Sequence, residues 1–241
     1  MTTTETEGLS GVQVSPVQTL PGTVRAATPG VKGFDINRVV TPQIAQSFVA
    51  AGYKYCIRYV GRLQMASNDL TTKEALTILD AGLALMIVQH FKGEGWQPDG
   101  PTGSQYGTNA GRFSKEIGVP AGVTVWCDLE GVAAGTPTQN VIDFCNNWFD
   151  QVQAAGYVPG LYVGNSAGLS ANQLFQKLRF QHYWRAYNLN DDEVPATRGV
   201  QLRQKTGKGT VGGVTTGEYD DDFTQTDALG GNAVWLAPAG S

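Results

Sequence analysis

From about residue 33 onward, two hydrophobic patterns alternate along the chain. In one, nearly every position of a short segment is apolar or β-branched, as in L-A-L-M-I-V-Q-H-F (83–91). Such segments are typical of strands in a sheet that is covered on both faces. The pattern predicts eight strands, at 33–37, 54–60, 83–91, 123–130, 158–165, 182–188, 200–205 and 218–224.

In the other pattern, apolar residues recur at the three- and four-residue intervals of an amphipathic helix. The segment after the first strand also carries end signals, because Thr41 can cap a helix, Pro42 fits its first position and Gly52 can end it. The helices predicted in this way are 41–52, 71–82, 106–118, 137–156 and 171–178.

This alternation predicts an α/β fold. Parallel strands need crossover connections, and the helices between the strands supply them. Eight strands in roughly 200 residues predict a (β/α)8 TIM-like barrel whose last third is reduced. An open doubly wound sheet is the alternative, but the glycine-rich phosphate-binding turn of its dinucleotide-binding form is missing after the first strand.

The first 30 residues follow neither pattern. They are rich in Thr, Gly, Pro, Val and Ser, and Pro16, Pro21 and Pro29 argue against a long helix. We therefore expect a flexible N-terminal arm at 1–30 and one barrel domain at 31–241.

Composition narrows the functional classes. Of the 241 residues 16% are charged and the formal net charge is −4, without the clustered basic face of a nucleic-acid-binding protein. The three cysteines fit neither a zinc site nor a disulfide framework, and we interpret Cys56 and Cys127 as small buried residues. With only two histidines in the chain, a Cys–His nucleophile is disfavoured.

No segment of the chain is apolar over the length that a membrane-spanning helix needs. The N-terminal residues M-T-T-T-E-T-E-G-L-S (1–10) lack the basic region and apolar core of a classical secretory signal. We expect synthesis in the cytoplasm, followed by function there or by release through a non-classical route.

Polar side chains recur where the predicted strands end. In a parallel barrel these ends meet at one face, which is where barrel enzymes place their active sites. Residues two apart on a strand point the same way, so we expect Asp128 and Glu130 to face this mouth together. The polar strand-end residues are Asp35, Asn37, Arg58, Tyr59, Gln89, His90, Asp128, Glu130, Tyr162, Asn165, Trp184, Arg185, Tyr187, Gln201, Gln204, Asp220, Asp221 and Asp222.

Several carboxyl groups in one cleft suit glycoside hydrolysis. One carboxyl, kept protonated by a raised pKa, protonates the leaving oxygen, while another attacks the sugar, activates water or stabilises positive charge. We expect these catalytic roles at Glu130, Asp128, Asp35 and Asp220. Aromatic rings, Trp96 among them, could flank the sugar. The residues expected to bind substrate are Tyr59, Gln89, Tyr162, Trp184, Gln201 and Asp222.

These residues also have ordinary structural interpretations. Asp128 could cap the following loop, and His90 could be a hydrogen-bonded structural residue. The run from Asp220 to Asp222 could form a solvated or calcium-attracting turn. A hard cation could also bind oxygen ligands from four of the acidic residues, Asp35, Asp128, Glu130 and Asp220. No spacing motif supports such a site, and we expect no metal and no cofactor.

Six segments together carry a family resemblance. They are G-F-D-I-N (33–37), Y-C-I-R-Y-V-G (55–61), L-T-T-K-E-A-L-T-I-L-D-A-G-L-A-L-M-I-V-Q (70–89), V-T-V-W-C-D-L-E (123–130), G-Y-V-P-G-L-Y-V-G-N (156–165) and W-R-A-Y-N (184–188). Over about residues 31–225, the chain resembles the Rv2525c-like glycoside hydrolase-like domain family, first described as domain of unknown function 1906. It is also distantly similar to the family 25 lysozymes, TIM-like barrels that cleave peptidoglycan between N-acetylmuramic acid and N-acetylglucosamine.

The resemblance implies roles for the acidic residues. The D-x-E motif of the lysozymes matches Asp128 and Glu130, which makes Glu130 the proton donor. Their first-strand aspartate matches Asp35, and their last-strand aspartate matches Asp220, with Asp222 as the other register. A further aspartate of that family has no counterpart here, because the third predicted strand ends in an amide and an imidazole.

Two functions from different classes follow. The first is a lysozyme- or muramidase-like hydrolase that acts on bacterial cell-wall polysaccharide. The second, motivated by the missing carboxylate, is a barrel that binds a wall glycan or a protein partner without cleaving it. The N-terminal arm could tether it to a phage tail or a contractile injection particle, which would deliver it to the wall without a signal peptide. An injected toxin is a third hypothesis.

Overall fold

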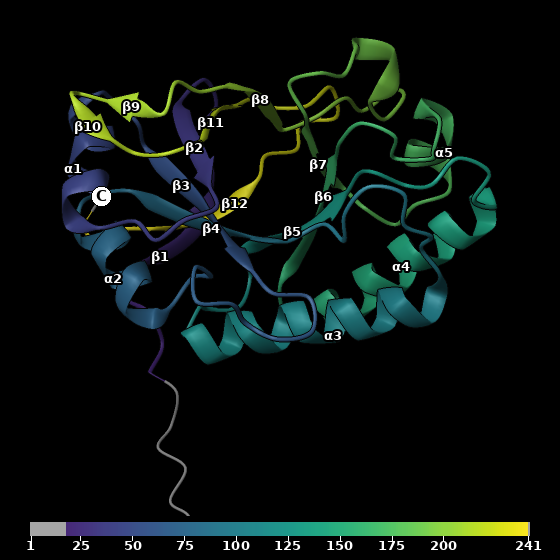
Figure 1. Cartoon of the computed structure of the whole chain (residues 1–241), viewed down its shortest axis with the longest axis horizontal. Coiled ribbons are helices and arrows are strands. Elements are labelled where there is room, and N and C mark those ends of the chain that lie inside the picture. Colours follow the sequence, from purple (N-terminus) through teal and green to yellow (C-terminus); the bar gives the residue numbers. More distant parts are fainter. Residues whose placement is uncertain (1–17, 241) are drawn as a thin grey trace, which may run out of the picture.

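In the computed structural model, which describes residues 18–240, the chain forms a closed barrel of eight strands with helices packed around it (Figure 1). The predicted α/β TIM-like barrel and all eight predicted strands are confirmed, with ends shifted by a few residues. In order around the barrel, the strands are β2 (Lys32–Ile36), β3 (Tyr55–Val60), β4 (Ala84–Gln89), β5 (Thr124–Leu129), β6 (Val158–Val163), β7 (His182–Arg185), β8 (Leu202–Thr206) and β11 (Asp220–Thr224).

The last strand of the barrel runs opposite to the others. The seven strands β2 to β8 are all parallel to one another, whereas β11, which lies between β8 and β2, is antiparallel to both. The first residue of β11 therefore lies at the end of the barrel where the other strands finish. A hairpin of β9 (Thr210–Val211) and β10 (Val214–Thr215), seen beside α1 in Figure 1, connects β8 to β11. This connection without a helix is the reduction expected for the last third.

The five predicted helices are present. The side chain of Thr41 accepts a hydrogen bond from the Ile44 N–H, as expected of an N-cap, and Gly52 follows the helix with a positive φ of 89°. Helices α3 and α4 lie side by side along the barrel (Figure 1). The helices are α1 (Pro42–Ala50), α2 (Thr72–Asp80), α3 (Gly100–Ile117), α4 (Thr138–Ala154) and α5 (Ala171–Gln176).

Helix α3 begins six residues before the predicted start, at a cap where Asp99 accepts from the Thr102 N–H. Three glycines four residues apart weaken its helical sequence signal, because glycine has a low helix propensity. In the structure these glycines, Gly103, Gly107 and Gly111, face α4. A Cβ at Gly103 would lie 2.2 Å from the Phe144 carbonyl oxygen. Helices α3 and α4 can therefore lie this close together only because these positions carry no side chain.

The expected N-terminal arm requires a correction. Residues 1–17 lie outside the described residues, but residues 18–30 are packed against the barrel, and Leu20 is buried. Thr23–Ala26 form strand β1, which pairs antiparallel with β12 (Val234–Ala237). Strand β12 in turn pairs with the start of β4, ahead of the point where β4 meets β5. None of the helices within residues 18–240 is long and apolar enough to cross a membrane.

Alternation along each strand sorts side chains between the barrel interior and the helices. On β3, the Tyr59 side chain faces inward, whereas Arg58 faces outward and forms a buried ion pair with Glu74 of α2 at 2.6 Å. Val40 donates its N–H to the same carboxylate, at 2.7 Å. Arg58, named above among the strand-end residues, therefore holds α2 to the barrel and lies outside the mouth.

Candidate active site

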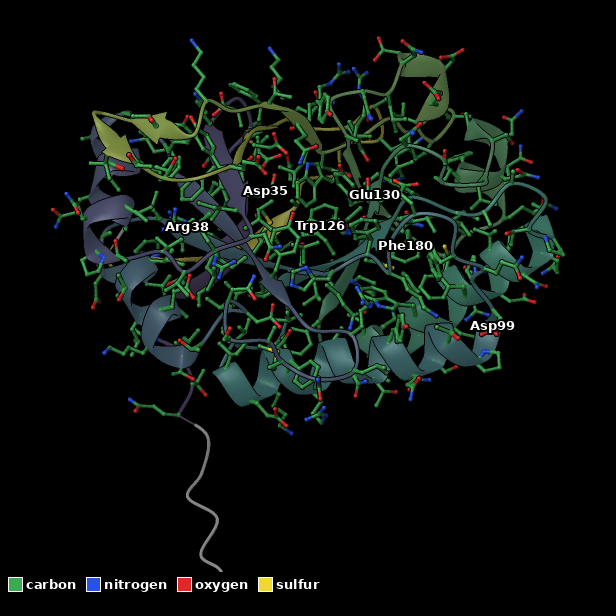
Figure 2. The ribbon with its side chains drawn as sticks, viewed as in Figure 1. Asp35, Arg38, Asp99, Trp126, Glu130 and Phe180 are labelled. Atoms are coloured by element: carbon green, nitrogen blue, oxygen red, sulfur yellow. The ribbon has the colours of Figure 1, made fainter. Side chains whose placement is uncertain are left out.

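Two neighbouring cavities open at the end of the barrel where the parallel strands finish. The inner one, of about 180 Å³, is lined by residues from β3, β4, β5, β6, β7, β8 and β11. The outer one, of about 650 Å³, shares Tyr59, Tyr187 and Asp220 with it and adds Asp35. We call these two cavities together the acidic cleft. Figure 2 shows Asp35 and Glu130 in the middle of the molecule, with Trp126 between them in this view.

Asp35 is held by two hydrogen bonds at the end of β2. The Tyr59 hydroxyl donates to Oδ1 at 2.7 Å, and the Gln204 amide donates to Oδ2 at 2.9 Å. Burial, reinforced by the charge of Asp220, raises the pKa of Asp35 to about 6, against the opposing effect of these hydrogen bonds. The carboxyl group is therefore fixed in position and titrates near neutral pH.

Asp128 and Glu130 face the cleft together, as the two-residue spacing predicts. Asp128 is buried, and its pKa is raised well above the usual value by burial, then by the charges of Glu130 and Asp35. Glu130 is half-buried, and burial together with Glu94, Asp35 and Asp220 raises its pKa to about 7. At neutral pH a large fraction of Glu130 is thus protonated, which is the state that a general acid needs.

The position of Glu130 depends on its neighbours. The Trp96 indole N–H donates to the Glu130 carbonyl oxygen at 2.7 Å, so this ring supports the end of the strand. Trp96 is buried and packs edge-on against Phe144, so its ring offers no open face to a sugar. On the other side, a Cβ at Gly164 would lie 2.4 Å from Glu130 Oε2, so only glycine leaves room for this carboxyl group.

The two candidate aspartates of the last strand lie at different depths. Asp220 is opposite Asp35 in the register of β11 and β2, and it lines both cavities of the cleft. Burial raises its pKa, and a hydrogen bond from the Gly207 N–H opposes that rise. Asp222 is fully buried beneath the cleft, opposite Gly33, and lines neither cavity. Burial and the charges of Asp35 and Asp220 raise its pKa well above the usual value.

Among the expected binding residues, three aromatic side chains do line the cleft. Tyr59, Tyr162 and Trp184 come from β3, β6 and β7, and the last two rings lie edge to face with centroids 4.6 Å apart. Trp184 is only 1% exposed, so it forms the floor of the cleft and offers no open face to a ligand.

Two of the expected binding residues, both amides, lie elsewhere. The Gln89 side chain points away from the cleft, where its amide donates to the Gly61 and Tyr106 carbonyls and its oxygen accepts from Trp148. Gln201 bonds the Tyr183 N–H and Asp227 on the outside of the barrel. Successive side chains of a strand point to opposite faces. An error of one residue in predicting which side chains face the barrel interior therefore assigns outward-facing residues such as Gln89 and Gln201 to the cleft.

Gln204 and Tyr187 also line the cleft, although neither is among the residues expected to bind substrate. Gln204 bridges the cleft, donating to Asp35 and accepting from the Tyr162 hydroxyl at 3.0 Å. Tyr187 is 52% exposed at the rim and lines both cavities. Both are among the polar strand-end residues named above. Gln201 and Gln204 have opposite parity along the strand, so only one of them can face the cleft.

The metal alternative finds no site in the part of the chain that the structure describes. Within residues 18–240, no group of three or more His, Cys, Asp or Glu side chains is arranged to hold a metal ion. The four acidic residues considered for a hard cation come from β2, β11 and the end of β5, and they line the acidic cleft without forming such a group. The three cysteines are buried and free, as expected for small packing residues.

The fold and the acidic cleft define a glycoside hydrolase-like TIM barrel. The family model of the Rv2525c-like, glycoside hydrolase-like domain matches residues 46–224. This range covers more than half of the chain, which therefore belongs to that family. A search for similar sequences among curated proteins found no match.

Solved structures share the fold at low sequence identity. The Tat-secreted protein Rv2525c of Mycobacterium tuberculosis, crystallised with L-tartrate, is 17% identical over 82% of this chain and 96% of its own, with a TM-score of 0.61. The bacterial lysozyme of Streptomyces coelicolor is 17% identical over 84% and 95%, with a TM-score of 0.54. A family 25 glycosyl hydrolase of Bacillus anthracis is 12% identical over 80% and 88%, with a TM-score of 0.55.

Proposed function

We propose that the protein hydrolyses glycosidic bonds of bacterial cell-wall polysaccharide, with peptidoglycan as the substrate. The observation that carries this proposal is Glu130, a half-buried carboxyl at the mouth of a lysozyme-like barrel with a pKa raised to about 7. A protonated carboxyl beside other carboxyl groups is the arrangement that glycoside hydrolysis requires. The likeness to lysozyme structures supports the choice of substrate.

In this mechanism Glu130 protonates the oxygen of the leaving sugar. Asp128 lies two residues earlier on the same face, where its carboxyl group helps to position the sugar and the attacking water. Asp35, fixed by Tyr59 and Gln204, assists from the opposite side of the cleft together with Asp220. Tyr187, exposed at the rim, offers its ring to a sugar face.

The site of action follows from the substrate. Peptidoglycan lies outside the cytoplasm, and the structurally similar Rv2525c is a secreted protein. We therefore place the activity of this protein at the cell wall.

Incubation of the purified protein with purified peptidoglycan tests the proposal by measuring new reducing ends. The wild type is expected to release them, and Glu130→Gln to lower the rate by about 10²–10⁴-fold, the usual contribution of a general acid. Glu116→Gln is the matched control, because Glu116 is exposed on α3 and pairs with Arg112 outside the cleft. Unchanged release by Glu130→Gln would contradict the proposed role.

A second function is favoured by one specific observation. Strand β4 contributes Val88 to the cleft, so this wall of the site is apolar and carries no carboxyl group. A barrel of this kind could bind a wall glycan without cleaving it. Saturable binding of the wild type to cell walls, with no reducing ends released over a range of pH, would establish this alternative.

A further inference from the structure

A third cavity opens beside the acidic cleft, and its charged lining has the opposite sign. Its volume is about 570 Å³, within the range of sites that bind small molecules. The cations come from the loops that follow β3 and β4, namely Arg62 and Lys92, and the lining also includes His90 and Asp69. We call this cavity the basic pocket.

The one carboxylate that lines the basic pocket is already engaged. Asp69 Oδ1 lies 2.7 Å from His90 Nε2, and Oδ2 accepts from the Ala66 N–H at 2.7 Å. Neither Arg62 nor Lys92 forms an ion pair with an acidic residue within the described part of the chain. The pocket therefore carries a net positive charge inside a protein whose formal net charge is −4.

The loop that carries Arg62 is held in place. The guanidinium donates to the Phe91 carbonyl, and the Asn109 side chain donates to the Arg62 carbonyl at 2.7 Å. These bonds link the loops after β3 and β4 to α3. A guanidinium has five N–H donors, so this anchoring still leaves donors for a ligand in the pocket.

The basic pocket and the acidic cleft share a wall. The Tyr59 ring stacks on His90 with centroids 4.8 Å apart, and its hydroxyl bonds Asp35. A cavity of about 10 Å³ lies between the two spaces and is lined by both Arg62 and Asp128. The two cavities thus lie on either side of the Tyr59–His90 pair, and a glycan that extends from the cleft over this pair would bring a side group to the cations.

We propose that the basic pocket binds the carboxylate of an acidic substituent carried by the glycan in the acidic cleft. This inference rests on the proposed function, which supplies the glycan. The charged residues that line the cleft are mostly acidic, although Lys208 lines its outer cavity, so a negatively charged substituent is more stable where Arg62 and Lys92 can both pair with it. A neutral glycan forms no such ion pair and leaves the two cations to solvent, so it is expected to bind more weakly.

Binding measurements separate this inference from catalysis. The ligands are peptide-free glycan strands whose sugars carry carboxylates, and the same strands with those groups converted to methyl esters. Calorimetry on Glu130→Gln, which prevents cleavage during the titration, is expected to give about ten-fold tighter binding of the acid form, as for a hydrogen bond to a charged group. Adding Arg62→Gln or Lys92→Gln is expected to reduce this preference, while Lys73→Gln, an exposed position on α2, is expected to retain it.

The two proposals fail in different ways. Equal affinity for acid and ester, or a full preference in both pocket variants, would overturn the role of the basic pocket even if the wild type releases reducing ends. A preference that depends on Arg62 and Lys92 would uphold it even if no reducing ends appear. Circular dichroism and thermal unfolding show that each variant is folded, so that a lost preference reports on the pocket.

Discussion

At the scale of single residues, the acidic cleft combines carboxyl groups whose surroundings set different proton affinities. Asp35 is buried but accepts two hydrogen bonds, and its pKa is about 6. Glu130 is half-buried beside three other carboxylates, and its pKa is about 7. Because the pKa of Asp35 is the lower of the two, there is a narrow pH range in which Asp35 is ionised while Glu130 keeps its proton. Divided proton occupancy of this kind is how two carboxyl groups can serve as base and acid at one pH.

This order predicts a bell-shaped dependence of activity on pH. As pH falls below about 6, Asp35 gains a proton and its negative charge is lost. As pH rises above about 7, Glu130 loses the proton that it must donate. Reducing-end release is therefore expected to peak between these values. Rates measured from pH 4 to pH 9 check this, and a rate that keeps rising to pH 9 would contradict Glu130 as the acid.

Gly164 provides a second residue-scale prediction. A Cβ there would lie 2.4 Å from Glu130 Oε2 and 2.5 Å from Glu130 Cβ, closer than such atoms approach, so Gly164→Ala must displace this side chain. Misplacing a catalytic group by about 1 Å can cost about 10²-fold in rate, and we expect a loss of that order in kcat. Gly100→Ala is the control, since its new methyl group would lie 2.9 Å from Asn147 Nδ2 and 3.5 Å from Asp143 Cβ, away from the cleft. Equal kcat values for Gly164→Ala and the control would contradict this constraint.

The same scale shows why the cleft could be predicted only in part. The spacing of Asp128 and Glu130 fixed their common direction once the strand was recognised, since side chains two apart share a face. The end of a strand can be located from sequence only to within about a residue, which does not establish which of two successive side chains faces inward. The prediction that Gln89 faces the cleft is therefore wrong, and Val88 faces it instead. The separation of Asp220 from Asp222 needed the register of β11 against β2, which no local pattern contains.

At the scale of elements, α3 and α4 depend on a stripe of glycines. A Cβ at Gly103 would meet the Phe144 carbonyl oxygen at 2.2 Å, and one at Gly107 would meet the Trp148 carbonyl oxygen at 2.6 Å. Because α4 also carries Trp148, whose indole bonds Gln89 behind β4, the helix pair is connected to the barrel. Glycine weakens an isolated helix, and here close packing against α4 compensates for that weakness.

We therefore expect Gly103→Ala to destabilise the protein, although alanine favours helices. Overpacking a tight interface costs about 1–3 kcal/mol, whereas replacing glycine by alanine in a helix gains about 1 kcal/mol of helix propensity. We expect the overpacking cost to lie near the upper end of its range and therefore to exceed this gain. Ser104→Ala, one residue further along the same helix, is the control. Urea unfolding monitored by far-UV circular dichroism measures both, and a Gly103→Ala variant more stable than the wild type would refute the role of the stripe.

The strands and helices were predictable to the extent that their patterns are local. The eight barrel strands are short apolar segments, and the caps at Thr41 and Thr71 lie next to the helices that they begin. Strands β1 and β12 are four residues long and pair across the whole chain, so nothing near either of them signals the pairing. The antiparallel direction of β11 likewise depends on the short hairpin that replaces a helix.

At the scale of the whole molecule, the acidic cleft opposes the stability of the fold that forms it. Five carboxyl groups whose pKa values are raised by burial lie in or under one end of the barrel, namely Asp35, Asp128, Glu130, Asp220 and Asp222. Each is more easily ionised in the unfolded chain than in the native protein. The native state therefore loses stability as pH rises through these values, the opposite of the usual behaviour of a paired carboxylate. Sites that need such groups commonly sacrifice stability for activity.

Glu130→Gln tests this opposition, because glutamine has a similar shape and stays neutral. For Glu130 the favourable contribution of the neutral acid is complete below its ordinary pKa of 4.5 and is lost as pH rises through about 7. At pH 9 the substitution is expected to stabilise the protein by about 1 kcal/mol, a value reduced from the full shift because the side chain is partly exposed. That gain corresponds to a rise in Tm of about 2–4 °C, measured by differential scanning calorimetry, with no gain at pH 4. The control Glu116→Gln, exposed on α3, is expected to shift Tm little at either pH. A Tm gain for Glu130→Gln that is the same at both pH values would show that packing, and not relief of an unfavourable charge, is responsible.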